Sequence, residues 1–154
     1  MFDNLWVEKY RPKKLDDFCT SDSSTLKEFL GKCNEDNEIP NILLVGYPGI
    51  GKTTISKIIV NNLLECDYLY INASDENGID TIRSKVTGYA RTKSLFSIKI
   101  IILDECDGLT QDGQRALRNV MEEYSAITRF ILTANYKHRI IPALQSRCQT
   151  FDIN

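Results

Sequence analysis

The chain has 154 residues, of which 42% are hydrophobic and 26% charged, with a formal net charge of −2. This composition is ordinary for a globular protein of one domain, and the charge argues against a surface that binds nucleic acid everywhere, although it allows a local basic track. The five cysteines are far apart and odd in number, which indicates reduced thiols and not a disulfide framework or a zinc site. No apolar run reaches the length of a membrane span and no secretory signal precedes the first strand, so we expect an intracellular protein of the cytoplasm, nucleoid or nucleus.

The N-terminal residues 1–18 contain Pro12 and show no helical or strand period, so we expect an extended arm before a core of residues 19–154. Ser23 or Ser24 can cap a short helix that runs to Leu30. Four apolar segments and a weaker fifth predict strands: Asn41–Val45, Tyr68–Asn72, Ile98–Leu103, Arg129–Ala134 and Thr150–Ile153. Amphipathic segments between them predict helices at Thr54–Leu64, Ile79–Arg91 and Gln114–Tyr124. Apolar strands that alternate with helices predict an α/β fold, a three-layer sandwich whose parallel sheet is covered on both faces.

The segment GYPGIGKT at Gly46–Thr53 matches the phosphate-binding pattern G-x-x-x-x-G-K-[ST], and it lies between a predicted strand and a predicted helix. Its glycines let backbone N–H groups point at phosphate oxygens, and the helix adds its positive N-terminal end. Lys52 can reach the β- and γ-phosphates, and the Thr53 hydroxyl can ligate Mg²⁺. A plain glycine turn is the alternative, but it leaves the lysine unexplained. We therefore predict a nucleoside triphosphate site that includes Gly46, Pro48, Gly49, Gly51, Lys52, Thr53 and Thr54.

An acidic pair, Asp104–Glu105, follows the apolar strand in KIIILDECD. Asp104 is predicted to hold the Mg²⁺ shell, and Glu105 to orient and deprotonate a water molecule. A solvated acidic loop is the alternative, which the preceding phosphate loop disfavours. The pair favours hydrolysis over phosphoryl transfer to a small acceptor, whereas Asp107 is expected to be structural.

Two further polar residues are candidates for the same chemistry. Asn135 ends the strand RFILTAN, where it can position the attacking water or contact the γ-phosphate; the alternative is a cap of the strand end. Nothing in the rest of the chain is an obvious partner for Arg147. Arginines of this kind neutralise charge in triphosphate hydrolysis when a neighbouring molecule supplies them, and the alternative is a surface ion pair.

Three segments make a family resemblance specific: WVEKYRP at Trp6–Pro12, NASDENGID at Asn72–Asp80 and QSRC at Gln145–Cys148. Together with GYPGIGKT, DECD and TAN, they make the chain resemble the small motor subunits of sliding-clamp loaders over nearly its whole length. These are the replication factor C family of archaea and eukaryotes with its viral and phage relatives, within the AAA+ ATPases. The resemblance implies a five-stranded P-loop sheet in the order 5-1-4-3-2.

The resemblance also implies roles at matching positions. ATP and Mg²⁺ would be the cofactors: Lys52 and Thr53 would bind the nucleotide, and Thr53 would also bind Mg²⁺. Asn135 would read the γ-phosphate, and Arg147 would be an arginine finger that acts in the site of the adjacent subunit. The arm residues implied near the adenine are Val7, Tyr10, Arg11 and Pro12.

Members of this family assemble as five-subunit spirals around primer–template DNA and load a sliding clamp. The implied partners are therefore other clamp-loader subunits, the clamp and DNA, without a membrane. Groups near two helix N-termini would track the template phosphates, namely Arg83, Ser84, Lys85, Gln114 and Arg115. A phosphate suits a helix N-terminus, and a contact to the backbone alone needs no sequence preference. A solvated basic helix face is the alternative.

The sequence departs from the family pattern in three ways. Tyr47 and Ile50 stand where the family usually has a proline and a threonine, and Cys106 replaces the usual alanine. The family also continues into a helical lid and a helical collar, which we expect to be absent from a chain that ends at Asn154. Hydrolysis and assembly by the isolated chain are therefore expected to be weak or to depend on neighbouring subunits. The chain could be a truncated gene product or one half of a split subunit, and the sequence does not distinguish the two.

We expect the chain to be the ATP-hydrolysing core of a clamp-loader motor subunit, which helps to open a sliding clamp and load it onto primer–template DNA. The alternative is an ATP-binding module that does not hydrolyse the nucleotide and serves the assembly of a split clamp loader or another AAA+ machine. An origin-binding or branch-migration motor is disfavoured by the SRC triplet and by WVEKYRP.

Overall fold

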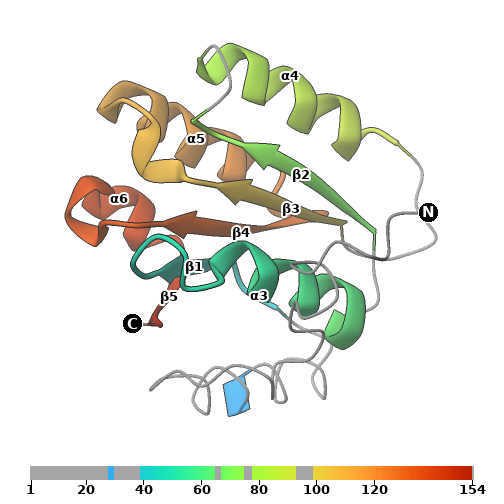
Figure 1. Ribbon diagram of the computed structural model, residues 1–154. Helices are drawn as coiled ribbons and strands as arrows, with labels where there is room; N and C mark the ends of the chain where they lie inside the picture. Colours follow the sequence, from blue (N-terminus) through green and yellow to red (C-terminus); the bar gives the residue numbers. More distant parts are fainter. Residues whose placement is uncertain (1–27, 30–38, 65–66, 75–77, 93–98, 154) are drawn as a thin grey trace, which may run out of the picture.

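The computed structural model describes residues 28–29, 39–64, 67–74, 78–92 and 99–153. In this part of the chain, five parallel strands form one sheet in the order β2-β3-β4-β1-β5 (Figure 1). The strands are β1 Ile42–Val45, β2 Tyr68–Asn72, β3 Lys99–Asp104, β4 Thr128–Ala134 and β5 Gln149–Asp152. This is the predicted order 5-1-4-3-2 read from the opposite edge, so the predicted topology is confirmed. Each strand boundary lies within one residue of its prediction.

The helices differ from the prediction mainly at their beginnings. They are α3 Lys52–Ile58, the π-helix η2 Ile59–Leu64, α4 Ile79–Ala90, α5 Gln111–Glu123 and α6 Pro142–Gln145, with short 3-10 turns η3 Cys106–Gly108 and η4 Lys137–Arg139. Helix α3 starts two residues before the predicted Thr54, because Gly51 takes a left-handed φ of 100° that lets the helix begin at the end of the loop. Helix α5 starts three residues before Gln114, because Thr110 caps it by accepting a hydrogen bond from the Gly113 N–H at 3.0 Å.

Both faces of the sheet are covered, as the sequence predicted (Figure 1). Successive residues of β1 alternate between two buried clusters: Leu43 and Val45 belong to one, and Ile42 and Leu44 to the other. The first cluster includes side chains of α4, α5 and α6, and the second those of α3 and the π-helix. The result is a three-layer α/β sandwich, because each face of the parallel sheet packs against helices.

Lys99, at the start of β3, fixes the C-terminal end of α4. The residue is 6% exposed, and its ammonium donates hydrogen bonds to the carbonyl oxygens of Tyr89 at 2.7 Å, Ala90 at 3.4 Å and Thr92, and to the Thr92 hydroxyl at 2.8 Å. A positive group suits the carbonyls that a helix leaves free at its C-terminus. The contact ties the end of α4 to the sheet.

Several predictions lie outside the described residues, including the arm of residues 1–18 and most of the helix predicted to end at Leu30, of which Glu28 and Phe29 are helical. Among the helices that the structure describes, none combines the length and the hydropathy needed to cross a bilayer.

Candidate active site

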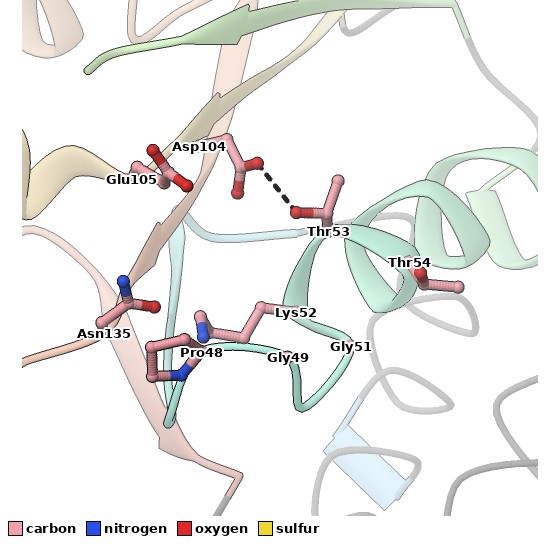
Figure 2. A pocket seen from close by; sticks show the side chains of 9 residues that line it. All are labelled: Pro48, Gly49, Gly51, Lys52, Thr53, Thr54, Asp104, Glu105 and Asn135. Atoms are coloured by element: carbon pink, nitrogen blue, oxygen red, sulfur yellow. Dashed lines mark hydrogen bonds between the residues drawn. The ribbon is translucent and has the colours of Figure 1, made fainter. Parts of the chain in front are cut away.

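The loop between β1 and α3 forms one wall of a cavity of about 310 Å³ (Figure 2). Gly49 and Gly51 adopt φ values of 81° and 100°, a region that L side chains rarely enter. The Ile50 N–H donates to the Tyr47 carbonyl at 3.3 Å, which closes a turn within the loop. These glycines are therefore required by the backbone of the loop itself, and α3 begins directly behind it.

The Lys52 side chain lies inside this loop. Its Nζ donates to the carbonyl oxygens of Gly46 at 2.7 Å and Tyr47 at 2.9 Å, and the residue is only 7% exposed. Burial lowers the pKa of the Lys52 ammonium, and the negative charges of Asp104, Asp107 and Glu105 partly oppose this. The lysine thus places a buried positive charge between the glycine loop and the acidic strand end.

Asp104 ends β3 opposite Thr53, the second residue of α3 (Figure 2). The Thr53 hydroxyl donates to Asp104 Oδ2 at 2.8 Å, so these two predicted Mg²⁺ residues touch. Two further hydroxyls contact the carboxylate: Tyr70 donates to Oδ2 at 2.8 Å, and Thr133 donates to Oδ1. Asp104 is 7% exposed, and these hydrogen bonds stabilise its negative charge in a buried position.

Glu105 follows Asp104 in a left-handed conformation, with φ 58° and ψ 49°. It is the one non-glycine residue with positive φ in the described ranges. Its N–H donates to Thr133 Oγ1 at 3.0 Å, and its Oε2 accepts from the Ser74 hydroxyl at 2.5 Å. Such a conformation costs of order 1–3 kcal/mol, and residues strained in this way cluster at functional sites. The turn places the exposed Glu105 carboxylate at the rim of the cavity.

Asn135 lines the same cavity from the end of β4, on the side of the phosphate loop (Figure 2). Its backbone N–H donates to Asp107 Oδ2 at 3.1 Å, and the next N–H, that of Tyr136, donates to the same oxygen at 3.3 Å. Asp107 thus holds the backbone that carries Asn135. This agrees with the structural role expected for Asp107.

The cavity brings together the predicted loop, metal and water-activating residues from three strand ends. Its lining residues are Pro48, Gly49, Gly51, Lys52, Thr53, Thr54, Asp104, Glu105 and Asn135. The Thr53 hydroxyl and the Asp104 carboxylate are hard oxygen donors that suit Mg²⁺. The described residues hold no cluster of three or more His, Cys, Asp or Glu suited to a metal. The two oxygen donors of Thr53 and Asp104 fit a magnesium ion that takes its remaining ligands from phosphates and water.

Arg147 does not line this cavity. Its guanidinium forms an ion pair with Glu122 of α5, which also pairs with Arg118 at 3.2 Å. The statement that Arg147 lacks a partner in its own chain is therefore wrong, because the partner comes from a helix 25 positions away that only the fold brings close. The pair is partly exposed, and it borders a second hollow of about 320 Å³ that Asn41, Met121 and Ser125 also line.

The predicted DNA residues divide into two groups. Arg83, Ser84, Lys85 and Arg115 are exposed, and the two arginines pair with Asp80 at 3.2 Å and Asp112 at 2.7 Å on their own helices. Gln114 is instead 1% exposed.

Gln114 uses its amide inside the protein. Its Nε2 donates to the carbonyl oxygens of Arg139 at 2.8 Å and Leu109 at 3.3 Å, and its Oε1 accepts from the Ile141 N–H at 2.8 Å. The prediction that this side chain contacts DNA is thus wrong, because its hydrogen-bonding groups are buried and occupied. The implied adenine residues, Val7, Tyr10, Arg11 and Pro12, lie outside the described residues.

Three hydroxyl residues of the site were missed from the sequence: Tyr70, Ser74 and Thr133. Thr133 precedes Ala134 and Asn135 in a strand that reads as apolar, and its position two residues before the strand-end asparagine was the available signal. Ser74 lies in the NASDENGID segment. Tyr70 carried no signal, since an aromatic residue in a strand usually serves packing.

Residues 42–153 match the model of the ATPase family associated with various cellular activities (AAA). The chain is 48% identical over 155 residues to the replication factor C small subunit of Staphylothermus marinus, a match that covers 96% of this chain and 46% of that protein. It is 42% identical over 154 residues to replication factor C subunit 5 of Arabidopsis thaliana, and this match covers 95% of this chain and 41% of that protein. The chain therefore spans about half the length of the curated relatives it matches.

Solved structures with the same fold include the Thermotoga maritima RuvB Holliday junction branch migration motor. The TM-score is 0.76 at 20% sequence identity, and the match covers 94% of this chain and 48% of that one. At this identity the likeness shows the shared fold alone.

Proposed function

The chain belongs to the AAA family of ATPases, as a relative of the replication factor C small subunits, and on this premise we propose that it binds ATP with Mg²⁺ and hydrolyses it as the motor core of a clamp-loader subunit. The observation that carries the proposal is the cavity, in which a phosphate loop faces the Thr53–Asp104 pair, Glu105 and Asn135. A site that only held a nucleotide has no need of a carboxylate at the rim next to the metal-binding pair.

Each loop residue has a role that follows from its position. The backbone N–H groups of the glycine loop and the N-terminus of α3 bind the phosphates, because this helix end carries partial positive charge. The Lys52 ammonium exchanges its carbonyl partners for β- and γ-phosphate oxygens and neutralises their charge. Thr53 and Asp104 hold Mg²⁺, which supplies further charge neutralisation at the phosphates.

Glu105 acts on the water molecule that attacks the γ-phosphorus. Its carboxylate orients the water and accepts a proton as the bond to phosphorus forms and the bond to the β-phosphate oxygen breaks. The Asn135 amide contacts the γ-phosphate from the neighbouring strand end, so it distinguishes ATP from ADP. Because Asp107 holds the Asn135 backbone from the turn that follows Glu105, the two residues keep a fixed relation.

We assign Arg147 to the active site of an adjacent subunit. Two facts support this: the guanidinium does not line its own cavity, and it is exposed next to a hollow on the surface. A guanidinium from the neighbour adds positive charge to the γ-phosphate in the transition state. The catalytic site is then complete only where two subunits meet.

The exposed groups of α4 and α5 suit the phosphate backbone of DNA. We propose that Arg83, Ser84, Lys85 and Arg115 contact primer–template DNA and that the assembly loads a sliding clamp, in the compartment that holds the genome. Contacts to phosphates alone bind any sequence, as a loader of primed DNA requires.

The test of the ATP site uses two variants of the chain. Lys52→Ala is expected to abolish binding of ATP, whereas Glu105→Gln is expected to bind ATP with unchanged affinity and to lose turnover. Fluorescent nucleotide binding and phosphate release measure the two properties. Turnover that persists in Glu105→Gln would refute the catalytic assignment of Glu105. If the unchanged chain hydrolyses no ATP even when it is mixed with clamp-loader subunits of its relatives, a sliding clamp and DNA, it would instead be a module that binds ATP without hydrolysing it.

The trans assignment is tested by mixing Arg147→Ala subunits with Glu105→Gln subunits. Each variant alone should be inactive, and the mixture should regain part of the activity at interfaces that join an intact Arg147 to an intact Glu105. Arg118→Ala is the matched control, because it removes the other arginine that pairs with Glu122. A mixture without any recovery, although assembly is intact, contradicts a shared site.

The DNA assignment is tested with Arg83→Ala, Lys85→Ala and Arg115→Ala. Each change should weaken DNA binding similarly for all sequences and reduce the slope of log affinity against log salt by about one. DNA binding with an unchanged salt slope in all three variants would leave these residues as a solvated surface.

A further inference from the structure

Asp104 receives more hydroxyl donors than the phosphate loop alone provides. Oδ2 accepts from Thr53 and from Tyr70, each at 2.8 Å, and Oδ1 accepts from Thr133. Thr53 belongs to α3 and Thr133 to β4, whereas Tyr70 comes from the edge strand β2. The carboxylate is therefore held from three different elements.

An ionised carboxylate offers about four lone-pair sites, two on each oxygen. The three hydroxyls occupy three of them, two on Oδ2 and one on Oδ1. The remaining site lies on Oδ1. Tyr70 thus fills the second acceptor site of Oδ2, so that Oδ1 is the oxygen with a free lone pair.

The sheet explains why Tyr70 reaches this carboxylate. Asn72 of β2 is the register partner of Asp104, and Tyr70 precedes Asn72 by two residues, so its side chain is on the same face of the sheet as the carboxylate. The Lys57 ammonium of α3 lies 5.0 Å from the centre of the Tyr70 ring. The ring is thereby placed between the phosphate-loop helix and the acidic strand end.

We propose that Tyr70 is a positioning residue for the metal site, which fixes the Asp104 carboxylate so that Oδ1 is turned to the hydration shell of Mg²⁺. This inference rests on the proposed ATP site and adds a residue that the phosphate-loop and acidic motifs do not contain. Groups that orient a metal-binding carboxylate through a hydrogen bond typically change metal affinity about 10- to 100-fold when removed. The ring supplies packing, and the hydroxyl supplies the orientation.

Tyr70→Phe isolates the hydroxyl, because it keeps the ring beside Lys57. Tyr68→Phe is the matched control, since it removes a hydroxyl from the same face of the same strand at a position paired with Ile100, four residues before Asp104. Binding of a fluorescent ADP analogue to the full 154-residue chain is measured in EDTA and across a range of Mg²⁺ concentrations. Urea unfolding of each variant checks that the fold is intact.

Tyr70→Phe is expected to bind the analogue normally in EDTA but to need about 10-fold more Mg²⁺ for half of the metal-dependent gain. Tyr68→Phe should match the unchanged chain in both conditions. The positioning role is overturned, while the ATP site stands, if Tyr70→Phe needs no more Mg²⁺ than the unchanged chain. It is also overturned if Tyr70→Phe loses the same affinity for the analogue with and without Mg²⁺. Failure of the unchanged chain to bind the analogue in any condition would refute the ATP site itself, and the Tyr70 proposal with it.

Discussion

The Ser74 hydroxyl lies 2.5 Å from Glu105 Oε2 and 2.7 Å from Asn72 Oδ1. A hydroxyl has one hydrogen to donate, so these two acceptors compete for it. When Ser74 donates to Glu105, it stabilises the carboxylate charge and occupies one of its oxygens. The turn after β2 thus restrains the group to which we assign activation of the water.

Ser74→Ala is expected to increase ATP turnover by up to about tenfold, because a hydrogen bond to a charged group contributes about 1.5 kcal/mol, which corresponds to that factor. Steady-state phosphate release measures the effect. The gain must disappear in the double variant Ser74→Ala/Glu105→Gln. Turnover that stays the same or falls in Ser74→Ala would show that the contact supports catalysis or is neutral.

Thr133→Val should destabilise the fold by about 2–3 kcal/mol. Valine has nearly the same shape, but it leaves the Glu105 N–H and one Asp104 oxygen without their buried partner. Thr133→Ser keeps the hydroxyl and is expected to cost only about 1 kcal/mol for the lost methyl group. Urea unfolding compares the two variants, and a valine variant as stable as the serine variant would contradict the role of the hydroxyl.

Gln114→Leu should cost about 3 kcal/mol in the free energy of unfolding, because the Arg139 carbonyl and the Ile141 N–H lose a buried partner. Arg115→Ala, at the next position, removes only an exposed ion pair and should change the stability by less than about 0.5 kcal/mol. Urea unfolding again provides the measurement. Similar stabilities for the two variants would contradict the buried role of Gln114.

The stability of the protein should fall at alkaline pH through two thiols. Burial raises the pKa of Cys148 to about 12 and that of Cys106 well above its ordinary value of 9.0. A raised pKa in the folded state means that the unfolded chain ionises first. The contribution of each buried, protonated thiol to the free energy of unfolding is therefore fully present below pH 9. It is lost as the pH rises through the pKa of that thiol in the folded protein.

Cys148→Ala removes one of these thiols. Between about pH 9 and 12 it should make the loss of unfolding free energy less steep by about 1.4 kcal/mol per pH unit. The slopes are compared because the alanine also loses packing at every pH. Urea unfolding under reducing conditions measures them, and equal slopes would mean that Cys148 ionises as readily in the folded protein as in the unfolded chain.

Much of the fold was predictable because its signals are local. The apolar runs placed all five strands within one residue, and GYPGIGKT and DECD identified the cavity that the two segments line together. The first residues of α3 and α5 were harder to predict. They are determined by the backbone conformation of Gly51 and by the capping hydrogen bond of Thr110, and not by the spacing of apolar residues.

The failures concern contacts between residues far apart in the chain. The contacts of Arg147 with Glu122, and of the Gln114 amide with the Arg139 and Ile141 backbone, exist only in the folded chain. Both polar side chains resemble exposed residues in the sequence. Their burial or pairing depends on the neighbouring strand or helix, which no local pattern encodes.

The hydrogen bonds of Lys99 have a consequence for how α4 can move. They fasten the C-terminal end of the helix to the first residue of β3, so a tilt about that end would displace the N-terminal end of α4 most. Gly78, with a φ of 116°, immediately precedes the first residue of the helix, and Arg83 and Lys85 lie near its middle. A rotation of α4 about the start of the strand that carries Asp104 would therefore shift the proposed phosphate contacts on this helix.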